Sequence, residues 1–338
     1  MCAGILYDDV RGPPQKGEAY PRMKKKLFCL ALAGIVSLTA CGSVQQNAAE
    51  EEKFPWRVSA VLPHTDQSYW TDLANGMREE AEARGIDLKV SIPQLNYNVD
   101  QMTSLVRQQT AAQVDALLVQ GIDDPDYRAA LWEAYEAGIE VMLVDTNDAQ
   151  LFDHVYVGTD NYEAGCTLGR ALLEISGGQA VVMIMSGEPN YPNLDERIRG
   201  LKETVAGYDG IQIVGVEYDK YDSLTVLDRY QAILQEHPEV DTLVGVEGTS
   251  CMALGLALNP ENAPLTILGF DRDEESEQGM ANGVIAGVVT QDSTGIGKKA
   301  IEVLADYFET GTHTQWEYYT PAEFCSREDY LQEVADYE

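Results

Sequence analysis

The sequence predicts an α/β protein with two doubly wound lobes, each a parallel sheet covered by helices on both faces. Three observations support this prediction. Short β-branched and apolar runs alternate with helical patterns along most of the chain, which is typical of parallel sheets. The alternation starts again after residue 160, which indicates a second unit. The 338 residues are also enough for two lobes of roughly 130–150 residues each.

The first unit shows the repeating pattern. Val58–Leu62 is expected to form a strand buried on both faces. The helix that follows has apolar residues at helical spacing and is expected to end at Gly85, in a left-handed cap. Ligands of such sheets bind at the carboxyl ends of strands, so Gln67, Tyr69 and Trp70 are candidate ligand-binding residues. The alternative is that both aromatic side chains only pack the helix against the sheet.

The remaining elements follow from the same two patterns. Apolar runs bounded by glycine, proline and polar residues predict strands at 86–91, 116–119, 139–144, 155–157, 180–185, 211–216, 242–246, 265–270 and 284–290. Apolar residues at helical spacing predict helices at 99–112, 125–137, 161–175, 194–206, 223–237, 250–258, 274–282 and 295–310.

The N-terminal region resembles an export signal. Met23 precedes three lysines and an apolar run of 12 residues, 27–38, which is too short for a permanent membrane span. The run ends in Leu-Thr-Ala-Cys, which resembles the bacterial lipoprotein signal with Cys41 as the lipidated first residue of the mature chain. An ordinary secretory peptide is the alternative. The expected segments are an unexplained extension at 1–22, a signal peptide at 23–40 and a flexible tether at 41–54.

Charge excludes one class of partner. The formal net charge is −33, and removal of residues 1–40 takes away six basic and three acidic side chains, which makes it −36. A nucleic-acid-binding protein needs a basic surface, so no nucleic-acid partner is expected. No other stretch is long and apolar enough for a membrane span, so the chain is expected at the extracytoplasmic face of the cell membrane, held by its lipid anchor.

The sequence carries no catalytic or cofactor motif. It has no glycine-rich phosphate loop and no nucleophile elbow, and its four histidines lack metal-ligand spacing. We therefore expect a protein that is not an enzyme and has no cofactor or metal. Cys166, Cys251 and Cys325 remain after signal removal, and either three buried thiols or one disulfide is consistent with their positions.

Four stretches carry a family resemblance. They are VSAVLPHTDQSYW at 58–70, HVYVGTDNYEAG at 154–165, HPEVDTLVGVEGTSCMALG at 237–255 and GFDRDEESEQGMANGVIAGVVTQD at 269–292. From about residue 54 the chain resembles the type I periplasmic sugar-binding proteins, the ribose- and galactose-binding group of ABC-transporter receptors. The resemblance implies a monomer that binds a sugar or polyol between its lobes and delivers it to an ABC permease. The alternative is a receptor for a sensor kinase or a chemotaxis system.

The resemblance also implies the domain boundaries. The N-terminal lobe is expected to comprise 55–159 and 292–320, and the C-terminal lobe 160–291 and 321–338. The chain would then cross between lobes three times, which forms a three-segment hinge.

The family's ligand-binding positions fall on particular residues here. The aromatic positions correspond to Tyr69, Trp70 and Tyr221, and the polar positions to Gln67, Asp145, Asp271 and Gln291. An ionised carboxylate accepts from two sugar hydroxyls at once, and such charge-assisted bonds are roughly twice as strong as neutral ones.

Three positions depart from the family pattern. Thr146 stands where an arginine is common, and Asp195 stands where another arginine opens a helix, with Arg197 two residues on. The family's asparagine before the ALG helix corresponds to Thr249 or Ser250. A neutral sugar, a polyol and an amino-bearing ligand therefore remain open. Asp195 is expected either to face the cleft with the other aspartates or to cap its helix.

Overall fold

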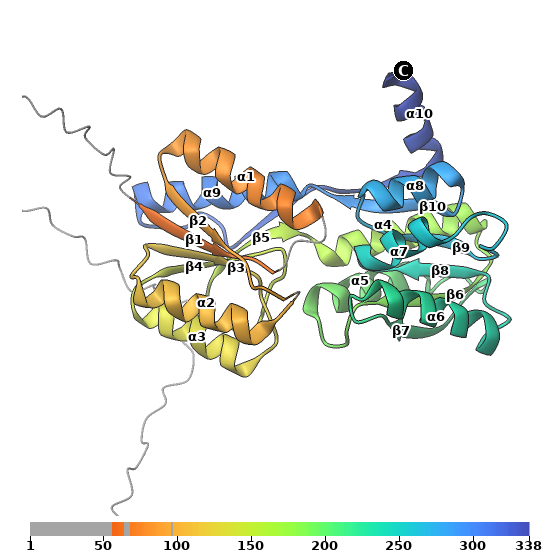
Figure 1. Cartoon of the computed structure of the whole chain (residues 1–338), viewed down its shortest axis with the longest axis horizontal. Helices are drawn as coiled ribbons and strands as arrows, with labels where there is room; N and C mark the ends of the chain where they lie inside the picture. The colour runs from red at the N-terminus through yellow and green to blue at the C-terminus, as the bar shows by residue number, and fades with distance from the viewer. Residues whose placement is uncertain (1–55, 64–67, 96, 338) are drawn as a thin grey trace, which may run out of the picture.

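The computed structural model describes residues 56–63, 68–95 and 97–337, which form two α/β lobes arranged along the long axis of the molecule (Figure 1). Gln67, Cys41 and the three N-terminal segments expected from the sequence lie outside the described residues.

The first lobe is built on a six-stranded parallel sheet within the described residues, in the order β11-β5-β4-β3-β1-β2. Its strands are β1 (Arg57–Val61), β2 (Asp87–Ser91), β3 (Ala116–Val119), β4 (Glu140–Val144), β5 (Val155–Thr159) and β11 (Glu317–Thr320). The strands β1, β3 and β4 are internal and almost wholly buried on both faces, as expected of a covered parallel sheet.

Two pairs of helices cover this sheet. The helices α1 (Ser68–Arg84) and α9 (Ser293–Thr310) pack on one face, and α2 (Val99–Ala111) and α3 (Pro125–Glu136) pack on the other (Figure 1). Alternate side chains of β3 serve the two faces: Leu118 joins the core under α1 and α9, and Leu117 joins the core under α2 and α3.

The second lobe repeats the plan with one difference. Its six-stranded sheet has the order β12-β10-β9-β8-β6-β7 within the described residues, and the edge strand β12 pairs antiparallel with β10. The strands are β6 (Ala180–Ser186), β7 (Ile211–Tyr218), β8 (Thr242–Gly245), β9 (Thr266–Phe270), β10 (Ile285–Gln291) and β12 (Ala322–Ser326).

The helices α4 (Asn161–Ser176) and α5 (Pro192–Val205) cover one face of the second sheet. The helices α6 (Ser223–Glu236), α7 (Gly248–Ala257) and α8 (Glu274–Asn282) cover the other face. The helix α10 (Arg327–Tyr337) follows β12 and extends away from the body of the lobe at the C-terminus (Figure 1).

The predicted fold class, two doubly wound lobes, is confirmed. Three elements after residue 310 were not predicted from the sequence: β11, β12 and α10. The strands are only four and five residues long and partly exposed at sheet edges, so they lack the continuous apolar run of the central strands.

The chain passes between the two sheets at three places. These are the step from β5 to α4, the step from β10 to α9, and the step from β11 to β12 at Pro321. Each step brings consecutive elements into different lobes. That these segments act as a hinge stays a prediction.

Two further sequence expectations concern cysteines and membrane spans. Cys166, Cys251 and Cys325 are all buried and free, so the reading as small buried side chains holds and the disulfide does not form. Within the described residues, no helix combines the length and apolar character that crossing a membrane requires.

Candidate functional site

Two aspartates occupy equivalent positions in the two lobes. Asp145 directly follows β4 and Asp271 directly follows β9, and both adopt the left-handed backbone region, with φ values of 66° and 63°. Aspartate tolerates this region better than most residues. The backbone amide of each donates to the neighbouring strand, to the carbonyl of Val157 at 3.1 Å and of Val289 at 2.9 Å. The backbone therefore turns at the end of each strand, and the carboxylate projects beyond the edge of the sheet.

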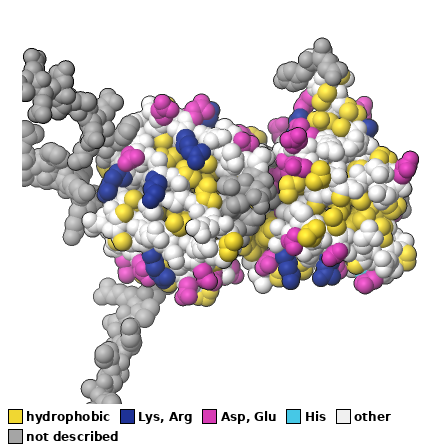
Figure 2. All heavy atoms as spheres, viewed as in Figure 1, with side chains coloured by type: hydrophobic (Ala, Val, Ile, Leu, Met, Phe, Trp, Pro, Cys, Tyr) yellow, Lys and Arg dark blue, Asp and Glu magenta, His cyan; other side chains and the backbone are white. Residues whose placement is uncertain are grey.

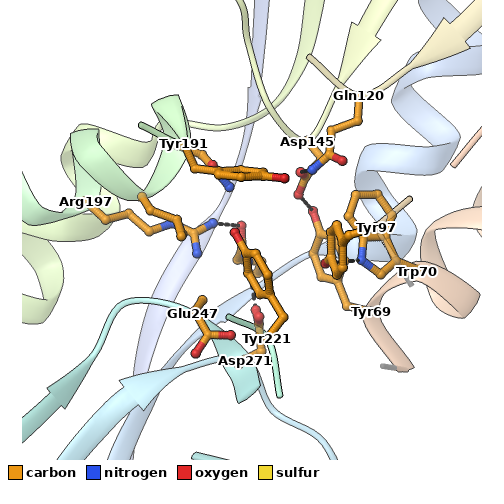
Figure 3. A pocket seen from close by; sticks show the side chains of 14 residues that line it. Tyr69, Trp70, Tyr97, Gln120, Asp145, Tyr191, Arg197, Tyr221, Glu247 and Asp271 are labelled. Atoms are coloured by element: carbon orange, nitrogen blue, oxygen red, sulfur yellow. Dashed lines mark hydrogen bonds between the residues drawn. The ribbon is translucent and has the colours of Figure 1, made fainter. Parts of the chain in front are cut away.

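Both carboxylates line one cavity of about 40 Å³ between the lobes (Figure 3). Tyr97 of the first lobe and Tyr221 of the second are in contact beside it, so the lobes stand close together. The first lobe contributes Tyr69, Trp70, Tyr97, Gln120 and Asp145 to the lining. The second lobe contributes Tyr191, Asn193, Leu194, Arg197, Tyr221, Glu247, Gly248, Asp271 and Gln291.

Asp145 is held by three side-chain donors. Its Oδ1 accepts from the hydroxyl of Tyr69 at 2.6 Å, and its Oδ2 accepts from Gln120 Nε2 at 2.9 Å and from Thr146 Oγ1 at 2.7 Å. The side chain is only 5% exposed. Burial and the charge of Asp145 raise the pKa of Tyr69 well above its usual value, so this tyrosine stays a neutral donor.

Asp271 belongs to a chain of polar contacts in the second lobe. Its Oδ1 accepts from Gln291 Nε2 at 2.7 Å, and Gln291 Oε1 accepts from Arg197 at 2.8 Å and from Thr159 Oγ1 at 2.8 Å. Burial raises the pKa of Asp271 to about 6, although the positive charge of Arg197 opposes this shift. The chain of contacts joins the second lobe to the end of β5 in the first.

The guanidinium of Arg197 reaches the cavity wall from α5. It is 2% exposed and donates to Asn161 Oδ1 at 2.8 Å and to the carbonyl of Val246 at 3.0 Å, in addition to Gln291. Its plane also lies over the Phe270 ring, 4.2 Å from the centroid. The departure of the sequence from the family's arginine positions therefore does not leave the cavity without a positive group.

Aromatic rings from both lobes enclose the cavity (Figure 3). Tyr97 and Tyr221 stack across the interface with ring centroids 4.7 Å apart and planes at 19°. Tyr69 and Trp70 meet edge to face at 5.1 Å, and the indole of Trp70 donates to the hydroxyl of Tyr97 at 3.0 Å. Tyr191 packs against Tyr221 at 5.6 Å. The rings provide apolar faces beside the polar groups.

A second carboxyl pair lies beside the cavity in the C-terminal lobe. Glu247 lines the cavity and caps α7, where its carboxylate accepts from the amides of Thr249 and Ser250 at 2.7 and 3.1 Å. Behind it, burial and the neighbouring charge of Glu247 raise the pKa of Asp219 to about 9. The raised pKa favours the protonated form of Asp219 at neutral pH.

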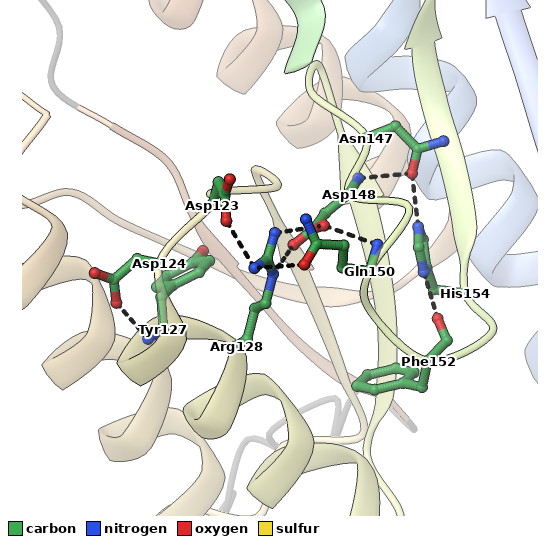
Figure 4. A network of polar contacts seen from close by, with 9 residues as sticks. All are labelled: Asp123, Asp124, Tyr127, Arg128, Asn147, Asp148, Gln150, Phe152 and His154. Atoms are coloured by element: carbon green, nitrogen blue, oxygen red, sulfur yellow. Dashed lines mark hydrogen bonds and ion pairs between the residues drawn. The ribbon is translucent and has the colours of Figure 1, made fainter. Parts of the chain in front are cut away.

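The loop after Asp145 is fixed by an ionic network (Figure 4). Arg128 on α3 forms two bonds with the buried carboxylate of Asp148, at 2.6 and 2.9 Å, and an ion pair with Asp123 at 2.7 Å. His154 bridges the side chain of Asn147 and the backbone carbonyl of Phe152, and burial lowers its pKa. This network holds the loop that begins with Asp145.

The structure brings most of the predicted ligand-binding residues together. Those that line the cavity are Tyr69, Trp70, Asp145, Arg197, Tyr221, Asp271 and Gln291. Thr146 lies directly behind Asp145 and supports its carboxylate. Gln67 is outside the described residues.

Asp195 is placed differently from both expectations. It is exposed and does not line the cavity, because the buried face of α5 is formed by Leu194, Arg197 and Ile198, and Asp195 points away from that face. It does not cap the helix either, since the N-cap residue is Tyr191 and makes no side-chain capping bond. The third cavity carboxylate is supplied instead by Glu247.

Thr249 and Ser250 also lie outside the cavity lining. Both are buried in the first turn of α7, where their amides bond to Glu247. The residues of this segment that reach the cavity are Glu247 and Gly248, one or two positions earlier.

Several lining residues were not predicted from the sequence. They are Tyr97, Gln120, Tyr191, Asn193, Leu194, Glu247 and Gly248. Gln120 directly follows β3 and Glu247 comes two residues after β8, so the position of strand ends could have identified both. Tyr97 and Tyr191 lie in longer loops where no periodic pattern marks a side chain's direction. Among the described residues, no group of three or more His, Cys, Asp or Glu side chains could hold a metal ion.

Known proteins share this architecture. The chain is 24% identical over 293 residues to the ribose import binding protein RbsB of Bacillus subtilis, an alignment that covers 84% of this chain and 93% of RbsB. It is 26% identical over 272 residues to the periplasmic protein TorT of Escherichia coli, with 77% and 75% covered. Among solved structures, GanP, a glucose-galactose binding protein from Geobacillus stearothermophilus, superposes with a TM-score of 0.76 at 27% identity, covering 81% of this chain and 98% of GanP.

A family model for the periplasmic binding protein domain matches residues 58–312, which is most of both lobes. This match, the two-lobed fold and the cavity between the lobes agree with one another. The family is one of binding proteins rather than enzymes. The chain belongs to the periplasmic binding protein domain family and has the type I fold of its sugar-binding members.

Proposed function

We propose that this protein is an extracytoplasmic, lipid-anchored solute receptor that binds a sugar or sugar-like small molecule in the cavity between its lobes and delivers it to an ABC importer. The observation that carries this proposal is the pair Asp145 and Asp271. Each leaves the end of a strand in a different lobe, and both reach the same aromatic-lined cavity.

The chemistry of the lining suits a polyhydroxylated ligand. Carboxylates accept strongly from hydroxyl donors. The rings of Tyr69, Trp70, Tyr191 and Tyr221 present apolar faces for the C–H side of a sugar ring. Arg197 donates to Gln291, and Gln291 donates to Asp271. A ligand bound to Asp271 would therefore be connected, through these side chains, to the place where the chain passes between the lobes.

The names of the relatives support import as the task. The relative RbsB is named for ribose import and the solved neighbour GanP for binding glucose and galactose. Export is supported by the family and by the signal-like residues 23–40, with Cys41 as the proposed lipid attachment site. We further propose that the protein acts as a monomer.

A receptor for a sensor kinase or a chemotaxis system would use the same cavity and differ only in its protein partner. Deletion of the gene distinguishes the two tasks once a ligand is known. Loss of uptake of the labelled ligand supports the importer, whereas normal uptake with a lost transcriptional or motile response supports the sensor.

A thermal-shift screen over sugars, polyols and amino sugars tests ligand binding itself. A ligand at 100 times its dissociation constant should add about 2.7 kcal/mol to the free energy of unfolding. Asp145→Ala should abolish the shift, and Asp195→Asn, outside the cavity, should retain it. A shift that survives Asp145→Ala unchanged would place the ligand elsewhere and contradict the proposal.

A further inference from the structure

Two amide oxygens of the cavity lining lack a hydrogen-bond donor from the described part of the chain. Gln120 Oε1 and Asn193 Oδ1, one from each lobe, are buried and have no hydrogen-bond partner among the described residues. The orientation of the Gln120 amide is fixed, since its nitrogen donates to the carboxylate of Asp145 and its oxygen must therefore lie on the other side. Gln120 is only 3% exposed, so its carbonyl oxygen can find a donor only in what occupies the cavity.

The carboxylates of the cavity add acceptors that already carry charge. Asp271 Oδ1 accepts from Gln291, but Oδ2 has no hydrogen bond within the described part of the chain. Asp145 and Glu247 line the same space. A buried acceptor without a donor loses the free energy of a hydrogen bond to water, so the oxygens of Gln120 and Asn193 favour a ligand rich in donors.

The charges of the lining are unbalanced. Its acidic residues are Asp145, Glu247 and Asp271, and the only basic residue among its described members is Arg197. Three of the five N–H groups of Arg197 are already bonded to Asn161, Val246 and Gln291. Arg197 therefore interacts mainly with the side of the cavity where the chain passes between the lobes. Carboxylates in a partly dry space repel one another unless a positive group offsets them.

The aromatic lining accepts a cation as well as a sugar face. Tyr69, Trp70, Tyr97, Tyr191 and Tyr221 all line the cavity. A ring face attracts a cation within about 6 Å through its negative quadrupole. Among the described residues, Arg197 is the one cation of the lining, and it lies over Phe270, which is not part of the lining. Arg197 therefore makes no such contact with the rings that line the cavity.

We propose that the ligand of this cavity carries a protonated amine on a hydroxylated ring or chain, which makes it an amino sugar or an amino polyol. An ammonium group has three donors and no acceptor, and so suits a lining in which the oxygens of Gln120 and Asn193 lack a donor among the described residues and the carboxylate of Asp271 lies nearby. Its charge offsets one of the carboxylates, and the hydroxyl groups meet the remaining N–H groups of Arg197. This inference rests on the proposed function as a sugar-type receptor and specifies its ligand.

Isothermal titration calorimetry with matched ligands tests the proposal. The pairs are galactose with galactosamine, glucose with glucosamine, and inositol with an amino-inositol, and each amine is also measured in its N-acetylated, uncharged form. We expect the tightest-binding amine to bind at least tenfold more tightly than both its hydroxyl parent and its N-acetyl derivative.

The outcomes separate this inference from the function on which it rests. If the tightest ligand is a neutral sugar and its amine binds no better, the inference is overturned and the receptor function stands. If no member of any pair binds, the sugar-receptor function fails, and the inference fails with it.

Two variants locate the charge that recognises the amine. Asp271→Asn keeps the oxygen that accepts from Gln291 and removes the charge, so it should weaken amine binding at least tenfold and binding of the neutral parent less than threefold. Asp195→Asn is the matched control, because it also removes one carboxylate charge but from an exposed position outside the lining. Equal losses for amine and parent in Asp271→Asn would overturn the proposal, as would equal losses of amine binding in both variants.

Discussion

At the scale of single residues, Asp145 and Asp271 differ in their electrostatic surroundings. Asp145 receives three side-chain hydrogen bonds, whereas Asp271 receives one from Gln291 and has the raised pKa. The charged groups that face Asp271 are Arg197 from α5, Glu247 at the start of α7 and Asp273 at the start of α8, with the hydroxyl of Tyr69 opposite. A group in this setting is sensitive to pH near neutrality.

This setting predicts how stability changes with pH. The pKa of Asp271 is raised from 3.8 to about 6 in the folded protein, so its contribution to the free energy of unfolding is complete below about pH 4 and is lost as pH rises through 6. As pH rises from 4 to 7, the free energy of unfolding of Asp271→Asn should therefore fall less than that of the wild type, by on the order of 2 kcal/mol. Chemical denaturation of the ligand-free protein between pH 4 and 7 measures it. Parallel curves for the wild type and the variant would contradict the assignment.

The sequence predicted part of the candidate site, namely the positions that match the family's ligand-binding residues. Asp145 and Asp271 were assigned through the family resemblance, and both directly follow strands whose carboxyl ends form the binding edge of a parallel sheet. Tyr97 and Tyr191 lie five or more residues after a strand, and their direction depends on backbone turns that no periodicity reveals. Asp195 was misplaced because one position along a helix turns a side chain by about 100°.

At the scale of elements, glycines set how closely the helices approach. A Cβ at Gly200 of α5 would lie 2.1 Å from the carbonyl oxygen of Tyr162 on α4, and one at Gly297 of α9 would lie 2.1 Å from that of Leu73 on α1. In each lobe, a glycine thus allows close contact between two neighbouring helices, α4 with α5 and α1 with α9. In the second lobe it positions α5, which carries Arg197 to the cavity.

Gly200→Ala should therefore destabilise the protein by about 1–3 kcal/mol, because the added methyl group overlaps backbone that cannot move freely. Ligand affinity should fall as well, since α5 would shift. Gly207→Ala is the control, because a Cβ there meets nothing within 4 Å, and it should change stability by less than about 0.5 kcal/mol. Equal denaturation midpoints for the two variants would refute this account of the helix contact.

The ionic network behind Asp145 gives a second prediction for elements. Arg128→Met leaves the carboxylate of Asp148 buried without its cation, and should lower the free energy of unfolding by about 2–4 kcal/mol. Arg107→Met in the same lobe breaks an exposed pair with Glu133 and should cost less than about 1 kcal/mol. Urea denaturation compares the two, and a similar small loss for both would mean that the network does not hold the loop.

At the scale of the whole molecule, the alternation of strands and helices predicted parallel sheets covered by helices, and its restart after residue 160 predicted two lobes. The region after residue 310 could not be predicted in this way. The strand β11 completes the first sheet and β12 the second, and both pair with strands more than 30 residues earlier in the chain. Such edge strands are defined by their partners rather than by a hydrophobic pattern of their own.

The surface charge also belongs to this scale. Acidic side chains are spread over the visible faces of both lobes (Figure 2), and the formal net charge is −33. A field of this sign attracts cationic solutes and raises their rate of encounter with the protein. It therefore acts in the same direction as the carboxylates of the cavity.

The proposed lipid anchor is tested by Cys41→Ala. We expect the variant to lose its membrane attachment while its thermal stability and ligand affinity stay unchanged, because residue 41 precedes both lobes. Fractionation of cells into membrane and soluble material measures the change. A variant that remained in the membrane fraction would contradict the assignment of Cys41 as the lipidated residue.

The central claim is that one small molecule binds between the two lobes, and a crystal structure with the tightest ligand of the titration series tests it most directly. The account predicts ligand density in contact with Asp145 from the first lobe and Asp271 from the second, beside the Trp70 ring. Density only at a surface site such as the hollow lined by Gly177, Tyr208 and Asp209, with the cavity between the lobes empty, would contradict it.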